Sequence, residues 1–114
     1  MSGPRKRLPR DDRRRQIVAA AIGVFGKHGY HAATTAELAR AAGVSEALLY
    51  QHFDSKKDLL LAAIAQIGEW VHEGLQEVLA ATRDPKVTLL QLSDAFREFT
   101  RSHPDVPRLA LALT

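Results

Sequence analysis

The sequence predicts an all-α protein about the size of one domain, and three observations support that fold class. Hydrophobic residues make up 46% of the 114 residues, which is enough for one modest core and too many for a solvated, disordered chain. Alanine and leucine together supply 33 residues, whereas valine and isoleucine supply 11, a balance that favours helix over sheet. Strict alternation of apolar and polar residues never extends beyond a few positions.

Several classes of protein are excluded or disfavoured by composition. Cysteine is absent, which excludes a disulfide framework, a zinc–thiolate site and a thiol nucleophile. The chain starts with basic residues that no apolar run follows, unlike a signal peptide. The longest hydrophobic stretch, Leu59–Ile67, is shorter than the roughly 20 residues of a membrane-spanning helix. We therefore expect a cytoplasmic protein with no membrane partner.

Charge is distributed unevenly along the chain. The first 15 residues carry seven basic and two acidic side chains, a net charge of +5, whereas the remaining 99 residues carry a net charge of −2. A basic segment attached to a slightly acidic body suggests that one end contacts a polyanion, although a solvated tail without function would have the same composition. We interpret residues 1–10, which include two prolines, as a flexible basic arm.

The first two predicted helices are bounded by capping residues. The first begins near residues 11–12, where a carboxylate can stabilise free amide groups at the helix start. It ends before Gly29, which suits the left-handed conformation of a helix end. The second helix follows Thr34, which forms a capping-box pattern with Glu37, and it ends at Gly43.

Four further helices are expected. Ser45 is the N-cap of a short helix over about 46–53, and a turn then leads into a long helix over about 56–81. A proline-containing segment ends that helix, and the apolar pattern resumes over 87–102. A sixth helix is predicted from residue 105 onward, with a proline near its first turn.

The second and third helices are joined by the short segment Ala42-Gly43-Val44-Ser45, which is the organisation of a helix-turn-helix. Gly43 permits a tight turn with positive φ, Val44 fills the angle between the helices and Ser45 caps the second one. Taken alone, these residues are more often part of an ordinary helical hairpin in a bundle. The turn by itself therefore leaves the function open.

A longer pattern around this turn resembles the N-terminal DNA-binding domain of the TetR family of transcriptional regulators. The resemblance covers residues 13–60 directly, and the long fourth helix continues the family pattern. Beyond residue 85 the chain resembles only the general α-helical regulatory half of the family. The residues that carry the resemblance are Phe25, Gly29, Tyr30, Thr34, Thr35, Leu38, Ala39, Ala42, Gly43, Val44, Ser45, Leu49, Tyr50, Gln51, His52, Phe53, Lys56 and Leu59.

The resemblance implies DNA-binding roles for several side chains. Thr35, at the start of the second helix, and Lys56, at the start of the fourth, match positions that contact phosphates, and a hydroxyl beside free helix amides suits that task. Tyr50 and His52 match groove-facing positions that reach phosphates or base edges. The exposed positions nearest the bases are Ser45, Glu46, Ala47, Leu48 and Gln51, and the arm residues expected to contact phosphates or the minor groove are Arg5, Lys6, Arg7 and Arg10.

Two groove positions are unusual for the family. Leu48 stands where many members carry a small or hydroxylated residue, and its side chain can contact a thymine methyl group but cannot hydrogen-bond a base. Glu46 brings a negative charge near the groove, which repels phosphates unless the carboxylate accepts a hydrogen bond from cytosine N4. An equally good interpretation of Glu46 is a first-turn acid that stabilises the helix dipole. Base readout is therefore expected to depend on Gln51, His52 and DNA shape.

No catalytic or metal-binding set is expected. The five histidines are scattered along the chain and no cluster of carboxylates accompanies them. Ser45 and His52 have no acidic partner in register that could complete a catalytic set. Trp70 is interpreted as a core or interface aromatic residue in preference to a lining residue of a ligand pocket. We predict that the chain is not an enzyme and needs no cofactor.

These observations predict three segments: the basic arm, a helix-turn-helix DNA-binding domain over 11–58, and a partial, truncated α-helical effector and dimerisation domain over 59–114 that begins with the long connecting helix. The resemblance implies a sequence-specific, ligand-responsive repressor that binds a palindromic operator in double-stranded DNA through the helix near 45–53. It also implies a homodimer and a small-molecule effector. The alternative is an α-helical ligand-binding or interaction module whose helix-turn-helix is purely architectural.

Truncation would leave apolar side chains of the last helices without part of their cover, because they would normally pack on helices outside this chain. Self-association at high protein concentration is the expected consequence. The side chains concerned are Leu89, Phe96, Phe99, Leu109, Leu111 and Leu113.

Overall fold

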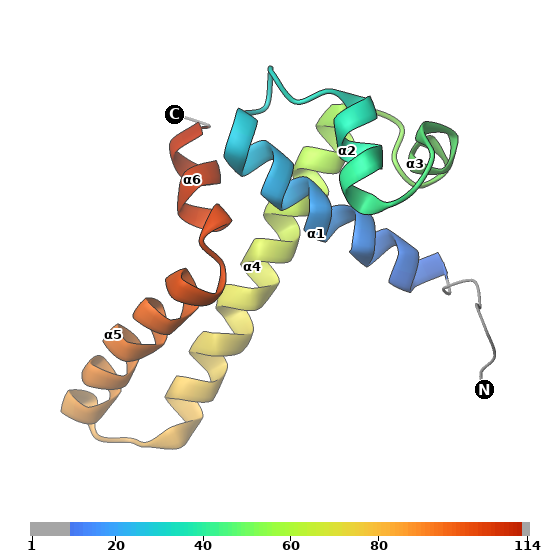
Figure 1. The fold of residues 1–114 in the computed structure, drawn as a ribbon. Coiled ribbons are helices and arrows are strands. Elements are labelled where there is room, and N and C mark those ends of the chain that lie inside the picture. Colours follow the sequence, from blue (N-terminus) through green and yellow to red (C-terminus); the bar gives the residue numbers. More distant parts are fainter. Residues whose placement is uncertain (1–9, 113–114) are drawn as a thin grey trace.

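The computed structural model describes residues 10–112, which form six α-helices and contain no β-strand. The predicted all-α fold class is therefore confirmed. Figure 1 shows α1, α2 and α3 gathered at one end of the molecule, with α4 running away from them and α5 returning beside it. Arg5, Lys6 and Arg7 of the predicted arm lie outside the described residues. Arg10, predicted as the last residue of the arm, is the first residue of α1.

The first three helices form the predicted helix-turn-helix arrangement. α1 spans Arg10–His28, α2 spans Thr35–Ala42 and α3 spans Glu46–His52. The predicted capping box of α2 is present: the Glu37 N–H donates to Thr34 Oγ1 at 3.1 Å, and the Thr34 N–H donates to Glu37 Oε1 at 3.0 Å. The hydrogen bond from the Thr34 backbone lowers the pKa of Glu37 below its ordinary value, because it stabilises the ionised carboxylate.

The turn between α2 and α3 has the predicted geometry. Gly43 ends α2 with φ at 74°, in the left-handed region that favours glycine. Ser45 Oγ accepts a hydrogen bond from the Leu48 N–H at 3.0 Å, so Ser45 is the N-cap of α3 as expected. The helix ends one residue earlier than predicted because Phe53 adopts an extended conformation and serves as the C-cap.

The last three helices also lie close to their predicted positions. α4 spans Lys56–Ala81, α5 spans Pro85–Ser102 and α6 spans Asp105–Ala112. α5 begins two residues earlier than predicted. The reason is local: the Asp84 side chain accepts a backbone hydrogen bond from the first turn at 2.9 Å, and a proline occupies the first helical position, where its missing N–H costs nothing.

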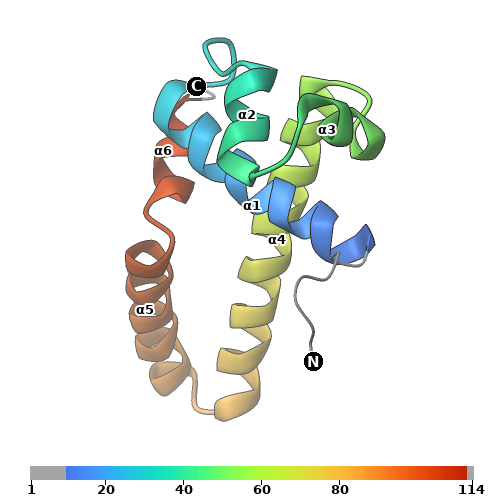
Figure 2. The same ribbon diagram turned by 45° about the vertical axis from the view of Figure 1, so that its right-hand side comes forward.

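The hydrophobic core lies where α1 crosses the other helices of the N-terminal end. Its largest fully buried side chains include Phe25, Ile17, Leu38 and Leu59, each exposed by 1% or less. α5 contributes no buried residue, and α4 contributes only Leu59 and Ala63. Figure 2 shows the result: the outer part of α4 and the whole of α5 form a two-helix arm that extends away from the core.

α6 returns from this arm and packs against α1 (Figures 1 and 2). The expectation that Leu109 loses its cover is therefore wrong: α6 places it in the core with 2% exposure. Glycines of α1 permit the close approach. A Cβ at Gly26 would lie 2.8 Å from the carbonyl oxygen of Asp105, and a Cβ at Gly23 would lie 3.3 Å from Oδ2 of the same residue.

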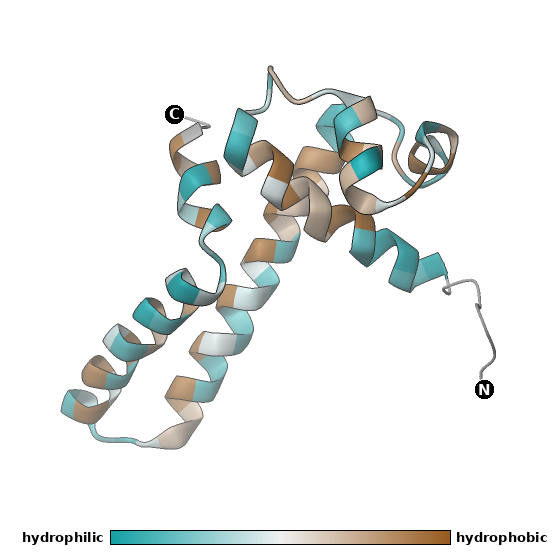
Figure 3. Ribbon diagram, in the orientation of Figure 1, coloured by the Kyte–Doolittle hydropathy of each residue, from teal (hydrophilic) through white to brown (hydrophobic). Residues whose placement is uncertain are grey.

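Apolar side chains remain exposed on the two-helix arm, where Figure 3 shows hydrophobic residues along both helices. Leu89 and Phe96 are each 69% exposed, and Leu111 of α6 is 75% exposed, so the exposure expected for these three side chains is present. Phe99 is half-buried. Leu113, the last residue of that predicted set, lies outside the described residues.

Candidate nucleic-acid interface

α3 is anchored through one face and presents the other to solvent. Leu49 and Phe53 face the core with exposures of 2% and 5%, whereas Tyr50 is 49% exposed and Gln51 is also exposed. This division follows from helical geometry, because residues four apart share a face and the buried pair is spaced by four. The phenol and the carboxamide are thus accessible to a molecule that docks on this surface.

The first turn of α3 is exposed as well. Ser45, Glu46 and Ala47 are exposed, and Leu48 is half-buried. The Ser45 oxygen accepts the capping hydrogen bond, which leaves its own hydrogen free to be donated. Glu46 and Tyr50 are four residues apart and share a face of the helix. Leu48 turns part of its side chain toward the protein, so only part of it is available to contact a base.

Thr35 and Glu46, both predicted to lie at the DNA, contact each other. Thr35 Oγ1 donates a hydrogen bond to Glu46 Oε1 at 2.9 Å. Since Thr35 is the first residue of α2 and Glu46 the first residue of α3, the contact joins the beginnings of the two helices. The residues are eleven apart in sequence, and sequence reasoning did not pair them because the pairing depends on how the helices pack.

His52 is half-buried at the end of α3. Its Nδ1 atom is buried without a hydrogen-bond partner in the described part of the chain. Burial lowers the pKa of His52 below its ordinary value, and the positive charges of Arg10, Arg14 and Arg13 lower it further. The imidazole is therefore largely neutral near pH 7 and available as a hydrogen-bonding group rather than as a cation.

Two arginines of α1 contact this end of α3, and the charge of a third, Arg13, acts on His52. Arg10 Nη2 donates to the carbonyl oxygen of Gln51 at 3.4 Å, and the guanidinium carbon of Arg14 lies 4.7 Å from the centre of the Phe53 ring. Arg13 and Arg14 were not among the predicted site residues. Their spacing of three and four residues from Arg10 was the signal that could have found them, because residues at that spacing share a helix face.

Lys56 is engaged inside the domain. Its Nζ atom donates to the carbonyl oxygens of Tyr30 at 2.7 Å, Ala33 at 3.1 Å and His31 at 3.5 Å, and it lies 4.4 Å from the centre of the Tyr30 ring. An ammonium group has three N–H donors, so each is directed at a carbonyl group of the loop that precedes α2. Its role as a phosphate contact stays a prediction, and a phosphate at this position would compete with these carbonyl groups for the ammonium group.

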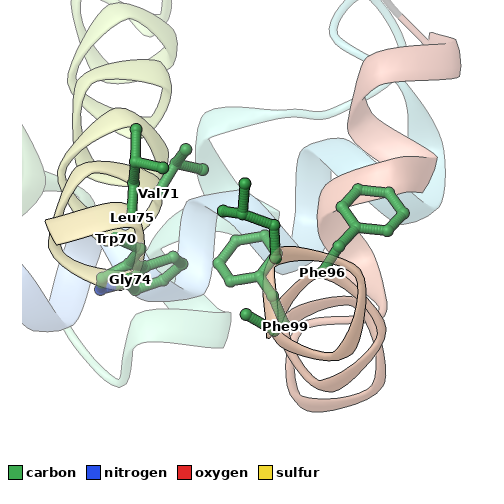
Figure 4. A pocket seen from close by; sticks show the side chains of 8 residues that line it. Trp70, Val71, Gly74, Leu75, Phe96 and Phe99 are labelled. Atoms are coloured by element: carbon green, nitrogen blue, oxygen red, sulfur yellow. The ribbon is translucent and has the colours of Figure 1, made fainter. Parts of the chain in front are cut away.

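A separate feature of the described residues is an open, apolar cavity of about 180 Å³ between α4 and α5. Figure 4 shows the cavity, with Trp70, Val71 and Leu75 contributed by α4 and Phe99 by α5. Trp70, interpreted above as a core or interface residue, packs against the hydrophobic core and also lines this cavity. Its ring also stacks against His103, with 4.4 Å between the ring centres.

Within residues 10–112, no group of three or more histidine, aspartate or glutamate side chains could hold a metal ion, and no helix is long and apolar enough to cross a bilayer. The α3 surface offers a phenol, a carboxamide, hydroxyls and nearby guanidinium groups, which are suited to non-covalent contact with phosphates and base edges, together with the carboxylate of Glu46.

The helix-turn-helix region matches a known family. The family model of bacterial regulatory proteins of the tetR family matches residues 17–63. The HTH-type transcriptional activator FasR of Mycolicibacterium smegmatis is 44% identical over 93 residues, covering 82% of this chain and 42% of FasR. The nucleoid occlusion factor SlmA of Marinobacter nauticus is 36% identical over 92 residues, covering 81% of this chain and 47% of SlmA.

A solved structure agrees with the sequence matches. A TetR-like transcriptional regulator from Rhodococcus sp. RHA1 superposes with a TM-score of 0.83 at 29% identity, covering 90% of this chain and 56% of that chain. The chain thus spans less than half the length of FasR and SlmA, and little more than half of the solved structure. The family match, the two relatives and the superposition all include the helix-turn-helix, and the chain belongs to the TetR family of bacterial regulatory proteins.

Proposed function

We propose that this chain is the DNA-binding part, with the beginning of the effector part, of a transcriptional regulator that acts in the cytoplasm. α3 enters the major groove of double-stranded DNA, with Tyr50, Gln51 and His52 toward base edges and phosphates. Thr35 and the basic residues of α1 and the arm contact the phosphate backbone. One observation carries the proposal: Tyr50 and Gln51 are exposed on a helix whose opposite face is buried.

The proposal extends to assembly and control. Two copies bind the two halves of a palindromic operator, since a two-fold symmetric dimer matches a two-fold symmetric sequence. A small apolar effector binds the cavity between α4 and α5 and changes the spacing of the two reading helices. The protein acts as a repressor. Because the relative FasR is named an activator, a promoter fusion measured with and without the regulator distinguishes repression, which we propose, from activation.

DNA binding is tested by fluorescence anisotropy with a pool of random duplex DNA at about 50 and 200 mM salt. We expect the affinity to fall as salt rises, with a log–log slope near −4.5 if about five phosphates are neutralised. Tyr50→Ala weakens binding at least about threefold if the phenol contacts the backbone, as one lost hydrogen bond implies. Gln76→Ala is the control, because Gln76 is exposed on α4 away from α3.

The alternative function predicts a different result. If the helix-turn-helix is purely architectural, wild-type protein, Tyr50→Ala and Gln76→Ala show the same weak or absent binding at both salt concentrations. Circular dichroism of each variant confirms that it is folded. If the wild-type protein binds DNA, selection of bound sequences from the random pool by the dimeric, longer form identifies the operator. The same selection with Gln51→Ala shows whether this substitution relaxes the preference at one base pair.

A further inference from the structure

The acidic side chain of Glu46 lies within the surface that α3 presents. Glu46 is exposed, and it shares a helix face with Tyr50, which is 49% exposed. A duplex that contacts Tyr50 therefore lies within about one helical turn of the Glu46 carboxylate, roughly 5–6 Å along the helix. A carboxylate at that position repels the phosphates of any duplex, whatever its sequence.

The hydrogen bond from Thr35 holds this carboxylate at a specific place. Thr35 Oγ1 donates to Glu46 Oε1 at 2.9 Å, and a hydroxyl group has a single hydrogen to donate. A phosphate oxygen that binds the Thr35 hydroxyl must take over that same hydrogen. The carboxylate and the phosphate thus compete for one donor, in addition to repelling each other.

The charge of Glu46 is not compensated by an ion pair within residues 10–112. The ion pairs in that range involve acidic residues other than Glu46, for example Glu37, which pairs with His28 at 3.8 Å. Glu37 is further held by the capping box, with its carboxylate directed back to Thr34. Glu46 is therefore an exposed acid of the α2–α3 surface that no basic side chain pairs with in the described residues.

We propose that Glu46 is a specificity-determining residue that weakens binding to the DNA backbone through its negative charge, which the hydrogen bond from the Thr35 hydroxyl holds at this surface. This inference rests on the function proposed above. The carboxylate weakens sequence-independent binding, so that tight binding depends on contacts that only the correct operator makes. A protein discriminates between partners by a difference in affinity, and a repulsive group that penalises the wrong partner enlarges that difference.

The test compares two substitutions that remove the same charge at different places. Glu46→Gln keeps an acceptor oxygen for Thr35 and removes the negative charge. Glu73→Gln is the matched control: Glu73 is exposed on α4, and its position 17 residues after Lys56 puts it about 25 Å along the helix, beyond the screening length of about 8 Å at physiological salt. Both are titrated with the random duplex pool at about 50 and 200 mM salt.

We expect Glu46→Gln to bind random duplex about three- to fivefold more tightly than wild type at the lower salt, the size of one screened charge pair at 4–6 Å in water. The gain shrinks at the higher salt because ions screen the repulsion. Glu73→Gln changes the affinity less than twofold. In a Thr35→Val background the gain from Glu46→Gln is smaller, because without the Thr35 hydroxyl the carboxylate is no longer held at the site.

Two outcomes overturn the inference separately from the proposed function. If Tyr50→Ala weakens binding but Glu46→Gln and Glu73→Gln behave alike, DNA binding stands and Glu46 has no such role. If Glu46→Gln weakens binding to random duplex, the carboxylate assists binding and the inference is wrong. If folded wild-type protein and every variant fail to bind duplex DNA at the lower salt, the proposed function fails and the inference fails with it.

Discussion

At the scale of single residues, side chains of the candidate interface already have partners within the chain. Ser45 caps α3, Thr35 donates to Glu46 and Lys56 donates to loop carbonyl groups. Each of these contacts contributes to the free energy of unfolding before DNA arrives. Substitutions at these positions therefore alter folding and binding together, and stability is measured first for every such variant.

Lys56 gives the clearest prediction of this kind. Lys56→Met removes the donors to the loop carbonyl groups and the ammonium over the Tyr30 ring. We expect the free energy of unfolding to fall by about 1.5–3 kcal/mol, the range for hydrogen bonds to a charged group. Lys57→Met, at the neighbouring exposed position, changes it little. Urea denaturation of both variants measures the difference, and equal stabilities would show that these contacts contribute nothing.

His52 predicts a dependence of stability on pH. Burial and the neighbouring arginines lower the pKa of His52 in the folded chain. In the unfolded chain His52 has the ordinary histidine pKa of about 6.5. Between these two pKa values the unfolded chain therefore binds more protons than the folded chain. Stability therefore falls as the pH falls below about 6.5 and is unaffected by this group above pH 7. His52→Gln removes this contribution. Thermal unfolding of both proteins between about pH 5 and 7.5 should show a steeper loss for wild type, and parallel curves would contradict the prediction.

At the scale of elements, α3 depends on its ends and its buried face. It has seven residues, whereas an isolated helix needs about 12–15 residues to be even marginally stable. Two features hold it in place: the N-cap Ser45, and the burial of Leu49 and Phe53. The exposure of Tyr50 and Gln51 to solvent thus depends on the cap made by Ser45 and on the burial of Leu49 and Phe53.

The cap of α3 can be tested by a substitution and its rescue. Ser45→Ala leaves the Leu48 N–H without its acceptor and should cost about 1 kcal/mol. Ser45→Asn should retain most of the stability, because asparagine is an equally good N-cap. Denaturant unfolding gives the energies, and amide hydrogen exchange of α3 reports whether the helix frays. An alanine variant as stable as the asparagine variant would mean that the cap is not needed.

At the scale of the whole molecule, α6 connects the two-helix arm to the helix-turn-helix core. It follows α5 directly, and it packs on α1, where Leu109 is buried. His103, between α5 and α6, stacks on Trp70 at the cavity. The cavity and the core are therefore joined by a few residues of continuous chain, in addition to α4.

The contact between α1 and α6 predicts opposite effects for two glycine substitutions. In a helix, glycine to alanine ordinarily stabilises by up to about 1 kcal/mol. Gly68→Ala on α4 should do so, since nothing lies within 4 Å of the added Cβ. Gly26→Ala should instead destabilise by about 1–3 kcal/mol, because its Cβ would meet the Asp105 carbonyl oxygen at 2.8 Å. Thermal unfolding of the two variants measures both effects. If both substitutions stabilise the protein, α6 does not pack closely on α1.

Much of the fold follows from short-range signals. Thr34, Ser45 and Gly43 specify where α2 and α3 begin and end, because each acts through its own backbone angles or through hydrogen bonds to groups no more than four residues away. The outward positions of Tyr50 and Gln51 follow from the burial of Leu49 by helical spacing alone. Arg13 and Arg14 lie outside the predicted site because basic charge alone does not indicate which face a helix turns toward its neighbour.

The sequence by itself determined the fold class, the six helices and the turn of the helix-turn-helix, since caps and apolar periodicity act over a few neighbouring residues. Only the tertiary structure decided that Leu109 is buried, that Lys56 is held by the loop before α2 and that Thr35 binds Glu46. These contacts join residues 11 to 26 positions apart, or opposite ends of the chain. Their distances depend on how the helices pack, which local propensity does not encode.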